Sequence, residues 1–560
     1  MTANLERIHD SLPALVRQMR AAAVDRREFL RASTLVGLSA AAAYALAGLE
    51  DPFGRPAAAA TEAGVVRISM RIPPLEDPAT YSWVYDSNVA RQVCDYLTRT
   101  GPDNVTRPWL VEKWEASGDV KTWILHLKKG VKWSNGDELV ADHVIWNMTR
   151  WLDEKVGSSI IGLMRYYMLV EYDTGEKDDG GQPRMGLRRW SEDAIQKVDD
   201  HTIRLNCAYP QAAVPEALFH YPALLLHPSQ HGRFGVGAIG TGAYSLVEYE
   251  VGRKVVLKRR DGYWGPRPAI ETIEIIDHGD DPSDAVAALA AGRVDGMCEA
   301  SPSQYVALSK LTNLKQYQIA TAQTAVARMQ QTNDTWKDPK VRQAMRYALD
   351  TRQLIRIAHL DRGAPGEHHH VAPVNPDYYK LPSMKPDIAK ARKLLAEAGH
   401  PHGFDTEIFC RKDPDWEPVC VQAMAQMWKQ IGVNVKVNVL STDEYRKMWD
   451  QPVAPFAFTA WTHRPHGVMT LGLAYRTGVP WNESKWSNPK FDELLAQAEA
   501  TLDINKRKQI MKDIEQLMLE DGPICLPLWR TVSTFMDKKV RGFKIHPSSY
   551  IFCEEWSLGA

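Results

Sequence analysis

Apolar and polar side chains alternate along several short stretches of the chain and recur at helical spacing along others. The alternating stretches are typical of half-buried strands, and they lie at residues 65–70, 122–127, 202–205, 244–249 and 433–440. Apolar residues three and four positions apart are typical of amphipathic helices, and they lie at 87–97, 142–151, 283–291, 339–349, 388–398, 416–430, 490–500 and 504–520. Strands that alternate with helices over this length predict an α/β fold with several lobes.

Local signals mark where several of these segments begin and end. Asp338-Pro339, Pro386-Asp387 and Asn488-Pro489 each precede a helical segment, where these residue types are favoured. Gly399 follows one helical segment directly, as glycine often does at helix C-termini. Residues 171–186 (EYDTGEKDDGGQPRMG) are polar and rich in glycine, which predicts an exposed insertion loop.

Length and composition narrow the class of protein. The 560 residues exceed the roughly 250–300 at which a single hydrophobic core stops growing, so we expect more than one lobe. Hydrophobic residues make up 44% and charged residues 24%, which is ordinary for a globular protein. A net charge of −1 gives no electrostatic footprint for nucleic acid or an anionic membrane surface. The 18 Trp and 20 Tyr are mainly core candidates, but such rings also line ligand clefts.

The first sixty residues have the features of an export signal. Residues 25–31 (DRREFLR) resemble the twin-arginine export signal, in which an Arg pair precedes Phe-Leu and a basic residue. A weakly apolar, Ala-rich run covers 32–47, and residues 57–60 offer a cleavage site of small residues. The run is short for a stable membrane span, so we expect cleavage rather than an uncleaved anchor. A lipid anchor is not expected, because the first cysteine is Cys94.

Cysteine spacing and catalytic motifs exclude several classes of site. The seven cysteines contain no C-x-x-C pair, which argues against zinc-ribbon and thioredoxin-like sites. Cys410 and Cys420 flank RKDPDWEPV, and either a disulfide or two buried thiols fits this spacing. Residues 235–240 match G-x-G-x-x-G, but a strand follows instead of a helix, so we predict no dinucleotide site. The hydrolase motifs G-x-S-x-G and H-E-x-x-H and the nucleotide-binding P-loop do not occur.

Four sequence blocks, in order, carry a resemblance to a known family. The first comprises PWLVEKW at 108–114, WILHL at 123–127, GVKW at 130–133, NGD at 135–137 and ADHV at 141–144. The second is GTGAYSLV at 240–247 with YWG at 263–265, and the third is DPKVRQA at 338–344 with YALD at 347–350. The fourth is AKARKLLAEAG at 389–399, answered by NPKFDELL at 488–495. Together they resemble the extracellular solute-binding proteins of family 5, the dipeptide, oligopeptide and nickel-binding class.

The resemblance implies an α/β fold of the periplasmic binding protein type II kind. Two ligand-gripping lobes and an extra domain would be built from mixed sheets with flanking helices, and the lobes would close on the solute by hinge motion. We expect a twin-arginine signal peptide at 1–60, a discontinuous lobe I from 61–106, 229–320 and 527–560, an extra domain at 107–228 and lobe II at 321–526.

Ligand contacts are expected in the segment that follows the late strand of lobe II. In peptide-binding members an Asp in this segment pairs with the ammonium group of the peptide, a charge-assisted contact. The matching stretch is AWTHRPHG at 460–467, and no acidic residue lies between Gln451 and Trp481, which puts a free-amine peptide in doubt. We predict that Trp461, His463 and Arg464 contact the ligand, because Arg and His suit a carboxylate, a phosphate or another electron-rich group. The alternative is a satisfied loop Arg and a solvent-facing His.

Further candidates are weaker, and a core or hydrogen-bonding role is an equal alternative for each. Trp83, Tyr85 and Trp336 could form aromatic walls, Arg362 could meet a carboxylate, and His368 belongs to the run EHHH at 367–370. Three adjacent His cannot all converge on one ion without help, so we predict no metal site and no cofactor.

Taken together, the sequence predicts the periplasmic solute-binding component of an ABC importer. It would capture a peptide-like or anionic organic solute and, as a monomer, deliver it to an inner-membrane permease after export by the twin-arginine machinery. Neither enzyme activity nor a nucleic-acid partner is expected. The alternatives are an exported hydrolase, which would turn over a test ester or peptide, a nickel or metal-chelate binding protein, and capture for signalling or chaperone work without import.

Overall fold

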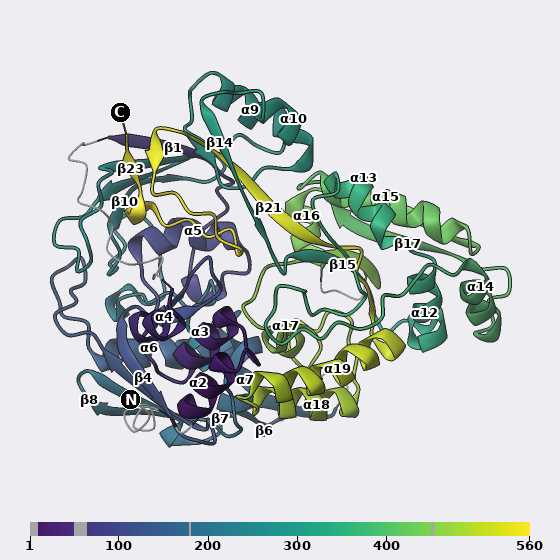
Figure 1. Ribbon diagram of the computed structural model, residues 1–560, viewed down its shortest axis with the longest axis horizontal. Helices are drawn as coiled ribbons and strands as arrows, with labels where there is room; N and C mark the ends of the chain where they lie inside the picture. The colour runs from purple at the N-terminus through teal and green to yellow at the C-terminus, as the bar shows by residue number, and fades with distance from the viewer. Residues whose placement is uncertain (1–8, 10, 50–63, 178–180, 450–452, 560) are drawn as a thin grey trace.

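The computed structural model describes residues 9, 11–49, 64–177, 181–449 and 453–559, and Figure 1 shows them as two lobes with a further domain beside the first. Lobe I is built on an eight-stranded mixed sheet in the order β10-β11-β12-β1-β13-β21-β14, with β16 paired to β21. Strand β1 pairs in parallel with β12 and β13, and the other pairs are antiparallel. The strands are β1 (Val65–Ser69), β10 (Tyr244–Glu250), β11 (Lys254–Arg259), β12 (Thr272–Ile276), β13 (Gly296–Met297), β14 (Leu314–Ala320), β16 (Gly363–Pro365) and β21 (Leu528–Asp537).

Helices α5 (Val84–Val93), α9 (Pro282–Ala290) and α10 (Tyr305–Leu308) belong to this lobe. The GTGAYS block has a steric basis here, because Gly240 and Gly242 pack on the last turn of α5. A Cβ atom at Gly240 would lie 1.9 Å from the Val93 carbonyl oxygen, to which the Gly242 amide donates a hydrogen bond of 2.8 Å. Only glycine allows so close an approach of two backbones.

Lobe II is built on a five-stranded sheet in the order β18-β17-β19-β15-β20. Its strands are β15 (Thr324–Met329), β17 (Phe404–Arg411), β18 (Val433–Leu440), β19 (Phe456–Trp461) and β20 (Ile524–Cys525). Its helices are α11 (Asp334–Lys337), α12 (Pro339–Tyr347), α13 (Thr351–His359), α14 (Ile388–Glu397), α15 (Trp416–Lys429), α16 (Thr442–Met448), α17 (Gly467–Ala474), α18 (Pro489–Glu499) and α19 (Ile504–Asp521). Asp338 and Asn488 cap α12 and α18, with Pro339 and Pro489 in the first turn. These caps explain why the sequence signals located the helix starts.

The extra domain carries a four-stranded antiparallel sheet in the order β4-β5-β9-β8. Its elements are β4 (Val111–Ala116), β5 (Thr122–Leu127), α6 (Ala141–Trp151), α7 (Ile161–Met168), β8 (Ile195–Asp199), β9 (Thr202–Asn206) and α8 (Val214–Ala217). The segment predicted as an insertion loop is instead a two-stranded ribbon, β6 (Leu169–Lys177) with β7 (Pro183–Arg189). The sequence hid it because most side chains of both strands reach solvent, so no apolar alternation marks them.

Two antiparallel stretches connect lobe I to lobe II. The chain passes from β14 to β15 at residues 320–324 and returns from β20 to β21 at 525–528. Across this connection Thr321 Oγ1 donates to the Arg530 carbonyl at 2.7 Å, and the Arg530 amide donates to the Gln323 carbonyl at 2.8 Å. Strand β21 pairs with β14 through residues 531–537 and with β16 through 528–530, and Figure 1 shows it running from one lobe into the other.

The N-terminal helices α2 (Leu12–Arg20), α3 (Arg26–Leu35) and α4 (Ala40–Ala47) pack against the folded body (Figure 1). Phe29 and Leu30 join a buried apolar cluster that includes Val105 and Ile504, while Arg26 and Arg27 stay exposed. Hairpin strands β2 (Thr98–Thr100) and β3 (Thr106–Pro108) lie under this cluster, and β22 (Val540–Arg541) pairs with β23 (Ser557–Leu558) near the C-terminus. None of the helices in the described ranges is both long and apolar enough to cross a membrane.

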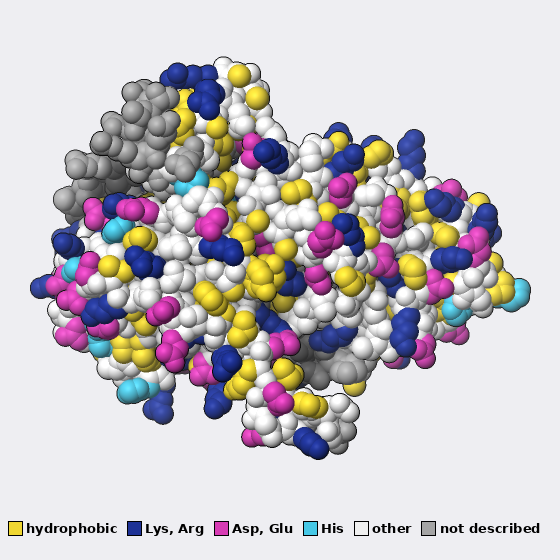
Figure 2. Space-filling view, turned by 90° about the horizontal axis from the view of Figure 1, so that it is seen from below, with side chains coloured by type: hydrophobic (Ala, Val, Ile, Leu, Met, Phe, Trp, Pro, Cys, Tyr) yellow, Lys and Arg dark blue, Asp and Glu magenta, His cyan; other side chains and the backbone are white. Residues whose placement is uncertain are grey.

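Charges and thiols are distributed without a dominant feature. Figure 2 shows basic and acidic side chains interspersed over one face of the molecule. All seven cysteines are buried free thiols, so Cys410 and Cys420 are two core residues and not a bridged pair.

Candidate ligand-binding site

The start of α5 brings lobe I into contact with lobe II. Trp83 occupies the N-cap position of α5, and its backbone amide donates to Asp86 Oδ2 at 3.2 Å. On the lobe II side, the guanidinium carbons of Arg411 and Arg446 lie 4.5 and 5.3 Å from the centre of a Trp83 ring. Arg446 also lies 3.4 Å from Asp86 Oδ2. Charge and ring contacts therefore join the lobes here, and we refer to this region as the interlobe site.

The carboxylate of Asp86 is buried at the interlobe site. Its exposed fraction is 3%, and its Oδ1 atom accepts no hydrogen bond. Burial raises the pKa of Asp86 to about 6, while Arg446 and the backbone amides of Trp83 and Ser82 oppose the rise. This carboxylate is therefore held in a poorly solvated position with one oxygen unused.

Two other guanidinium groups beside the interlobe site are matched by carboxylates. Arg411 Nε donates to Glu417 Oε2 at 3.1 Å, and Arg530 pairs with Glu299. Tyr85 lies half-buried at the same boundary, where Glu299 and Arg530 are its charged neighbours. These pairs neutralise one another and leave little net charge for a ligand to compensate.

Arg464 differs from these matched residues. It follows β19, has an exposed fraction of 2%, and its guanidinium lies 5.4 Å from the Trp461 ring. Its Nη1 donates to the Thr462 carbonyl at 3.0 Å, but its Nε atom has no hydrogen-bond partner. Burial lowers the pKa of Arg464, and its compensating neighbours in the described part of the chain are the phenols of Tyr221 and Tyr550, not a carboxylate.

A cluster of aromatic rings begins beside this guanidinium, at Trp461 and Tyr221. Tyr221, from the extra domain, donates from its hydroxyl to the Ser82 carbonyl at 3.0 Å and stacks on Trp481 at a ring distance of 6.5 Å. Trp461 and Trp449 approach Trp481 at 6.1 and 6.3 Å. Three parts of the fold thus meet in an aromatic enclosure with a buried cation, which suits a ligand that has both a carbon skeleton and a negative group.

Both ring nitrogens of His463 form hydrogen bonds within the protein. Its Nδ1 accepts from the Ala322 amide at 3.0 Å, which places the proton on Nε2, and Nε2 donates to Asn104 Oδ1 at 2.9 Å. Burial lowers the pKa of His463 well below its ordinary value, with His546, Arg31 and Arg464 adding to the effect. The side chain therefore joins lobe II to the β2–β3 hairpin as a neutral group.

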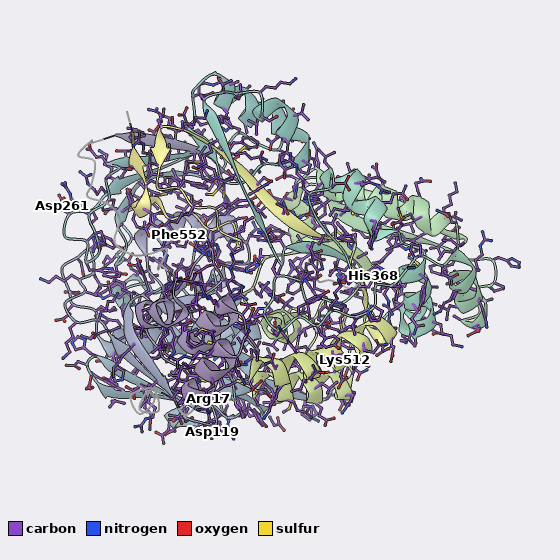
Figure 3. The ribbon with its side chains drawn as sticks, in the orientation of Figure 1. Arg17, Asp119, Asp261, His368, Lys512 and Phe552 are labelled. Atoms are coloured by element: carbon purple, nitrogen blue, oxygen red, sulfur yellow. The ribbon has the colours of Figure 1, made fainter. Side chains whose placement is uncertain are left out.

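The remaining predicted residues make contacts with other parts of the described structure. Trp336 is 1% exposed and packs in the core of lobe II against Phe456, at a ring distance of 4.7 Å. Arg362 lies over the ring of Tyr305 at 4.3 Å. His368 accepts from the Leu526 amide at 3.2 Å beside the interlobe connection, and Figure 3 shows it on the lobe II side, far from Phe552 in lobe I. Trp336 and His368 are thus packed within the fold.

The three consecutive histidines are core groups. Burial lowers the pKa of His368, His369 and His370 to about 3 each, so all three are neutral. His370 Nδ1 lies 2.7 Å from the Tyr475 hydroxyl. Among the described residues, these histidines included, no group of three His, Cys, Asp or Glu side chains is arranged to hold a metal ion.

The sequence analysis named Trp83, Trp461 and Arg464 as ligand contacts, which remains a prediction, and it did not name several of their neighbours. One feature could have drawn attention to Asp86, its position in the first turn of a helix. Tyr221 and Tyr550 carried no such feature, because their approach to Arg464 depends on contacts between residues that are far apart in the sequence.

Comparison with known proteins identifies the family of this chain. The family described as bacterial extracellular solute-binding proteins, family 5 Middle, matches residues 105–482. The dipeptide-binding protein of Escherichia coli K12 is 26% identical over 466 residues, which cover 79% of this chain and 84% of that protein.

Two solved structures share the fold. The protein AgaA of A. tumefaciens R10, in complex with agropinic acid, matches with a TM-score of 0.78 at 19% identity over 89% of this chain and 99% of its own. The dipeptide-binding protein of Pseudoalteromonas sp. SM9913, in complex with Met-Leu, matches with a TM-score of 0.76 at 19% identity over 89% of this chain and 100% of its own. The predicted α/β fold of the type II periplasmic binding protein kind is confirmed. The chain belongs to the family 5 bacterial extracellular solute-binding proteins, which act outside the cytoplasm and bind solutes instead of transforming them.

Proposed function

We propose that this protein captures a small organic solute with an acidic group at the interlobe site and delivers it to the permease of an ABC importer. The observation that carries the proposal is Arg464, a buried guanidinium with no carboxylate partner in the described structure. A buried charge without a counter-ion is costly, and an anionic ligand would remove that cost. Peptides and agropinic acid, the ligands named for the relatives, both carry acidic groups.

The proposed mechanism is closure of the two lobes on the ligand. Trp461 and Arg464 come from lobe II, Trp83 from lobe I and Tyr221 from the extra domain. A ligand that contacts all of them binds the closed form better than the open form, which is the condition for driving closure. The closed form then docks on the permease.

The first test is to identify what the natively purified protein releases when it is denatured, by mass spectrometry. An organic acid at one equivalent supports the proposal, whereas a metal chelate without an acidic group contradicts it. The second test compares the affinity of that ligand for the wild type and for Arg464→Gln by titration calorimetry. We expect a loss of about 10- to 100-fold, the worth of a charge-assisted hydrogen bond. Arg356→Gln, an exposed residue of α13, is the control and should bind normally.

We also propose the domain limits given by the sequence: lobe I at 61–106, 229–320 and 527–560, the extra domain at 107–228 and lobe II at 321–526. The distribution of strands among the three largest sheets supports this division, although β16 of lobe II adds to the sheet of lobe I. A monomer is proposed as the working unit, and light scattering should give the mass of one chain.

Export by the twin-arginine machinery is proposed for residues 1–60. The exposed Arg26 and Arg27 on α3 support it, because a receptor can reach them while Phe29 and Leu30 are covered. Arg26→Lys with Arg27→Lys should leave the chain in the cytoplasm, and terminal sequencing of exported wild type should begin near residue 60. Normal export of the double variant would contradict the assignment.

A further inference from the structure

The N-terminal helices are held both by lobe II and by the extra domain. On α2, Gln18 Nε2 donates at 3.2 Å to Oδ2 of Asp503, the N-cap residue of α19 in lobe II. At the end of α3, the Leu35 carbonyl accepts at 3.0 Å from the indole nitrogen of Trp114, on β4 of the extra domain. Trp114 is 2% exposed, and an indole has a single N–H donor. Departure of α3 would therefore take away the hydrogen-bond partner of a core side chain.

The third anchor is the β2–β3 hairpin, where the chain passes from lobe I into the extra domain. The Tyr44 hydroxyl, on α4, donates to Asp103 and accepts from Arg107 Nη2 at 2.7 Å. The guanidinium of Arg107 also lies 5.2 Å from the Tyr44 ring. Each of the three N-terminal helices thus makes a polar contact with a different part of the body.

Apolar packing joins these anchors into one interface. Phe29 is fully buried in a cluster that combines side chains of all three helices with Val105 of the hairpin and Ile504 of α19. Isolated helices shorter than roughly 12–15 residues are marginal in water, and α2, α3 and α4 have 9, 10 and 8 residues. Their order therefore depends on a surface that exists only while the hairpin and α19 lie side by side.

The hairpin and lobe II also touch directly, next to this cluster. Asn104 Nδ2 donates to the Pro465 carbonyl at 3.0 Å, and Asn104 Oδ1 accepts from His463 Nε2 at 2.9 Å. Asn104 precedes Val105 in the chain, so the apolar cluster borders the contact between the lobes. Separation of the lobes would pull Val105 away from Ile504 and break the cluster.

We propose that residues 11–49 form an autoinhibitory strap, which holds the β2–β3 hairpin against α19 and so keeps the lobes closed until the strap is removed. The lobes part only if the strap undocks, and a solute enters or leaves the space between them only when they part. A chain that retains the strap therefore exchanges solute slowly. This inference goes beyond the solute capture proposed above and rests on the proposed cleavage near residue 60 only for the moment of release.

The test measures the distance between the lobes in the full-length protein without any ligand. Nitroxide labels on Asp119→Cys in the extra domain and Lys512→Cys on α19, both exposed positions shown in Figure 3, are read by double electron–electron resonance. Phe29→Glu places a charge in the apolar cluster and should release the strap, whereas Arg17→Gln, at an exposed position of α2, is the control. We expect a single narrow distance with the wild-type strap and with the control, and a longer and broader distribution in Phe29→Glu.

Hydrogen exchange of residues 26–38 reports independently whether the strap is docked. Exchange there should be about 10-fold faster or more in Phe29→Glu, because the loss of a buried Phe side chain costs more than that factor requires. Gln18→Ala combined with Tyr44→Phe removes polar anchors on α2 and α4 with little change in shape. This second variant should show both effects in weaker form, and it serves if Phe29→Glu does not fold.

Each outcome decides the matter. Faster exchange with an unchanged distance would overturn the strap, because the helices would then leave without freeing the lobes. Wild-type exchange as fast as that of a free peptide, or no change in either reading in both variants, would overturn it as well. None of these results bears on solute capture at the interlobe site, which Arg464→Gln tests, and a failure of that test would leave the strap in place.

Discussion

Replacing Glu515 by Gln should remove a decline in stability that the wild type shows as the pH rises above neutrality. Glu515 lies on α19 with a fully buried side chain, and its Oε1 accepts from the Tyr379 amide at 3.0 Å. Its Oε2 has no hydrogen-bond partner and lies 3.8 Å from His369 Nε2. Burial raises the pKa of Glu515 to about 9, and the carboxylates of Asp377 and Glu367 add to the rise.

The sign follows from proton linkage. An unfolded Glu has a pKa of about 4.3, so between that value and about 9 the folded state holds a proton that the unfolded state has lost. The free energy of unfolding therefore falls as the pH rises, by about 1.4 kcal/mol per unit. Between about pH 7 and 8.5 the expected loss is about 2 kcal/mol. His369 has a pKa of about 3 in the fold and about 6.5 when unfolded, so it adds only a small slope of opposite sign in this window. That slope is the same in the wild type and in Glu515→Gln and cancels when the two are compared.

The assay is urea unfolding followed by Trp fluorescence across that pH window. The wild type should lose about 2 kcal/mol, Glu515→Gln should lose little, and Asp513→Asn on the exposed face of the same helix should follow the wild type. Parallel pH profiles for the wild type and Glu515→Gln would refute the reasoning.

Three further predictions concern stability and reactivity. All seven thiols are buried, and burial raises the pKa of Cys410 to about 12. A thiol reagent should therefore label the native protein slowly and should label all seven cysteines after denaturation. Fast labelling of the native protein would contradict this burial. Gly240→Ala should lower the free energy of unfolding by about 1–3 kcal/mol, measured by thermal unfolding, because a Cβ atom there would clash with the backbone. Gly235→Ala is the control and should leave stability unchanged, since a Cβ atom there meets nothing within 4 Å. Equal effects of the two substitutions would count against the steric argument. Arg328→Met should cost about 3–5 kcal/mol in urea unfolding, because it removes the buried cation whose Nε donates to Glu483 Oε2 at 3.0 Å. A loss below about 1 kcal/mol would mean that the pair contributes little.

Local chemistry made much of the fold predictable. Asp338 before Pro339 and Asn488 before Pro489 located α12 and α18, since a side-chain cap and a fixed proline φ act within one helical turn. The prediction of a loop at residues 171–186 was wrong, because a two-stranded ribbon with most side chains in solvent shows no alternation of apolar and polar residues.

The site was predictable only in part. Arg464 was named from its family segment, and its burial gives that prediction a physical reason. Trp336 lies in the core of lobe II, the alternative that the sequence left open, because a core tryptophan and a cleft tryptophan look the same in sequence. Asp86 was not named because its partner Arg446 lies 360 positions away. Pairings across lobes depend on how the sheets are placed, and local periodicity does not encode that placement.

Strand β21 has a mechanical consequence for the molecule as a whole. One segment pairs with β14 of lobe I, and the residues just before it pair with β16 of lobe II. Loss of the folded β16 segment would remove a hydrogen-bonding partner from β21, a strand of the lobe I sheet. Unfolding of lobe II at this connection should therefore weaken the end of the lobe I sheet as well.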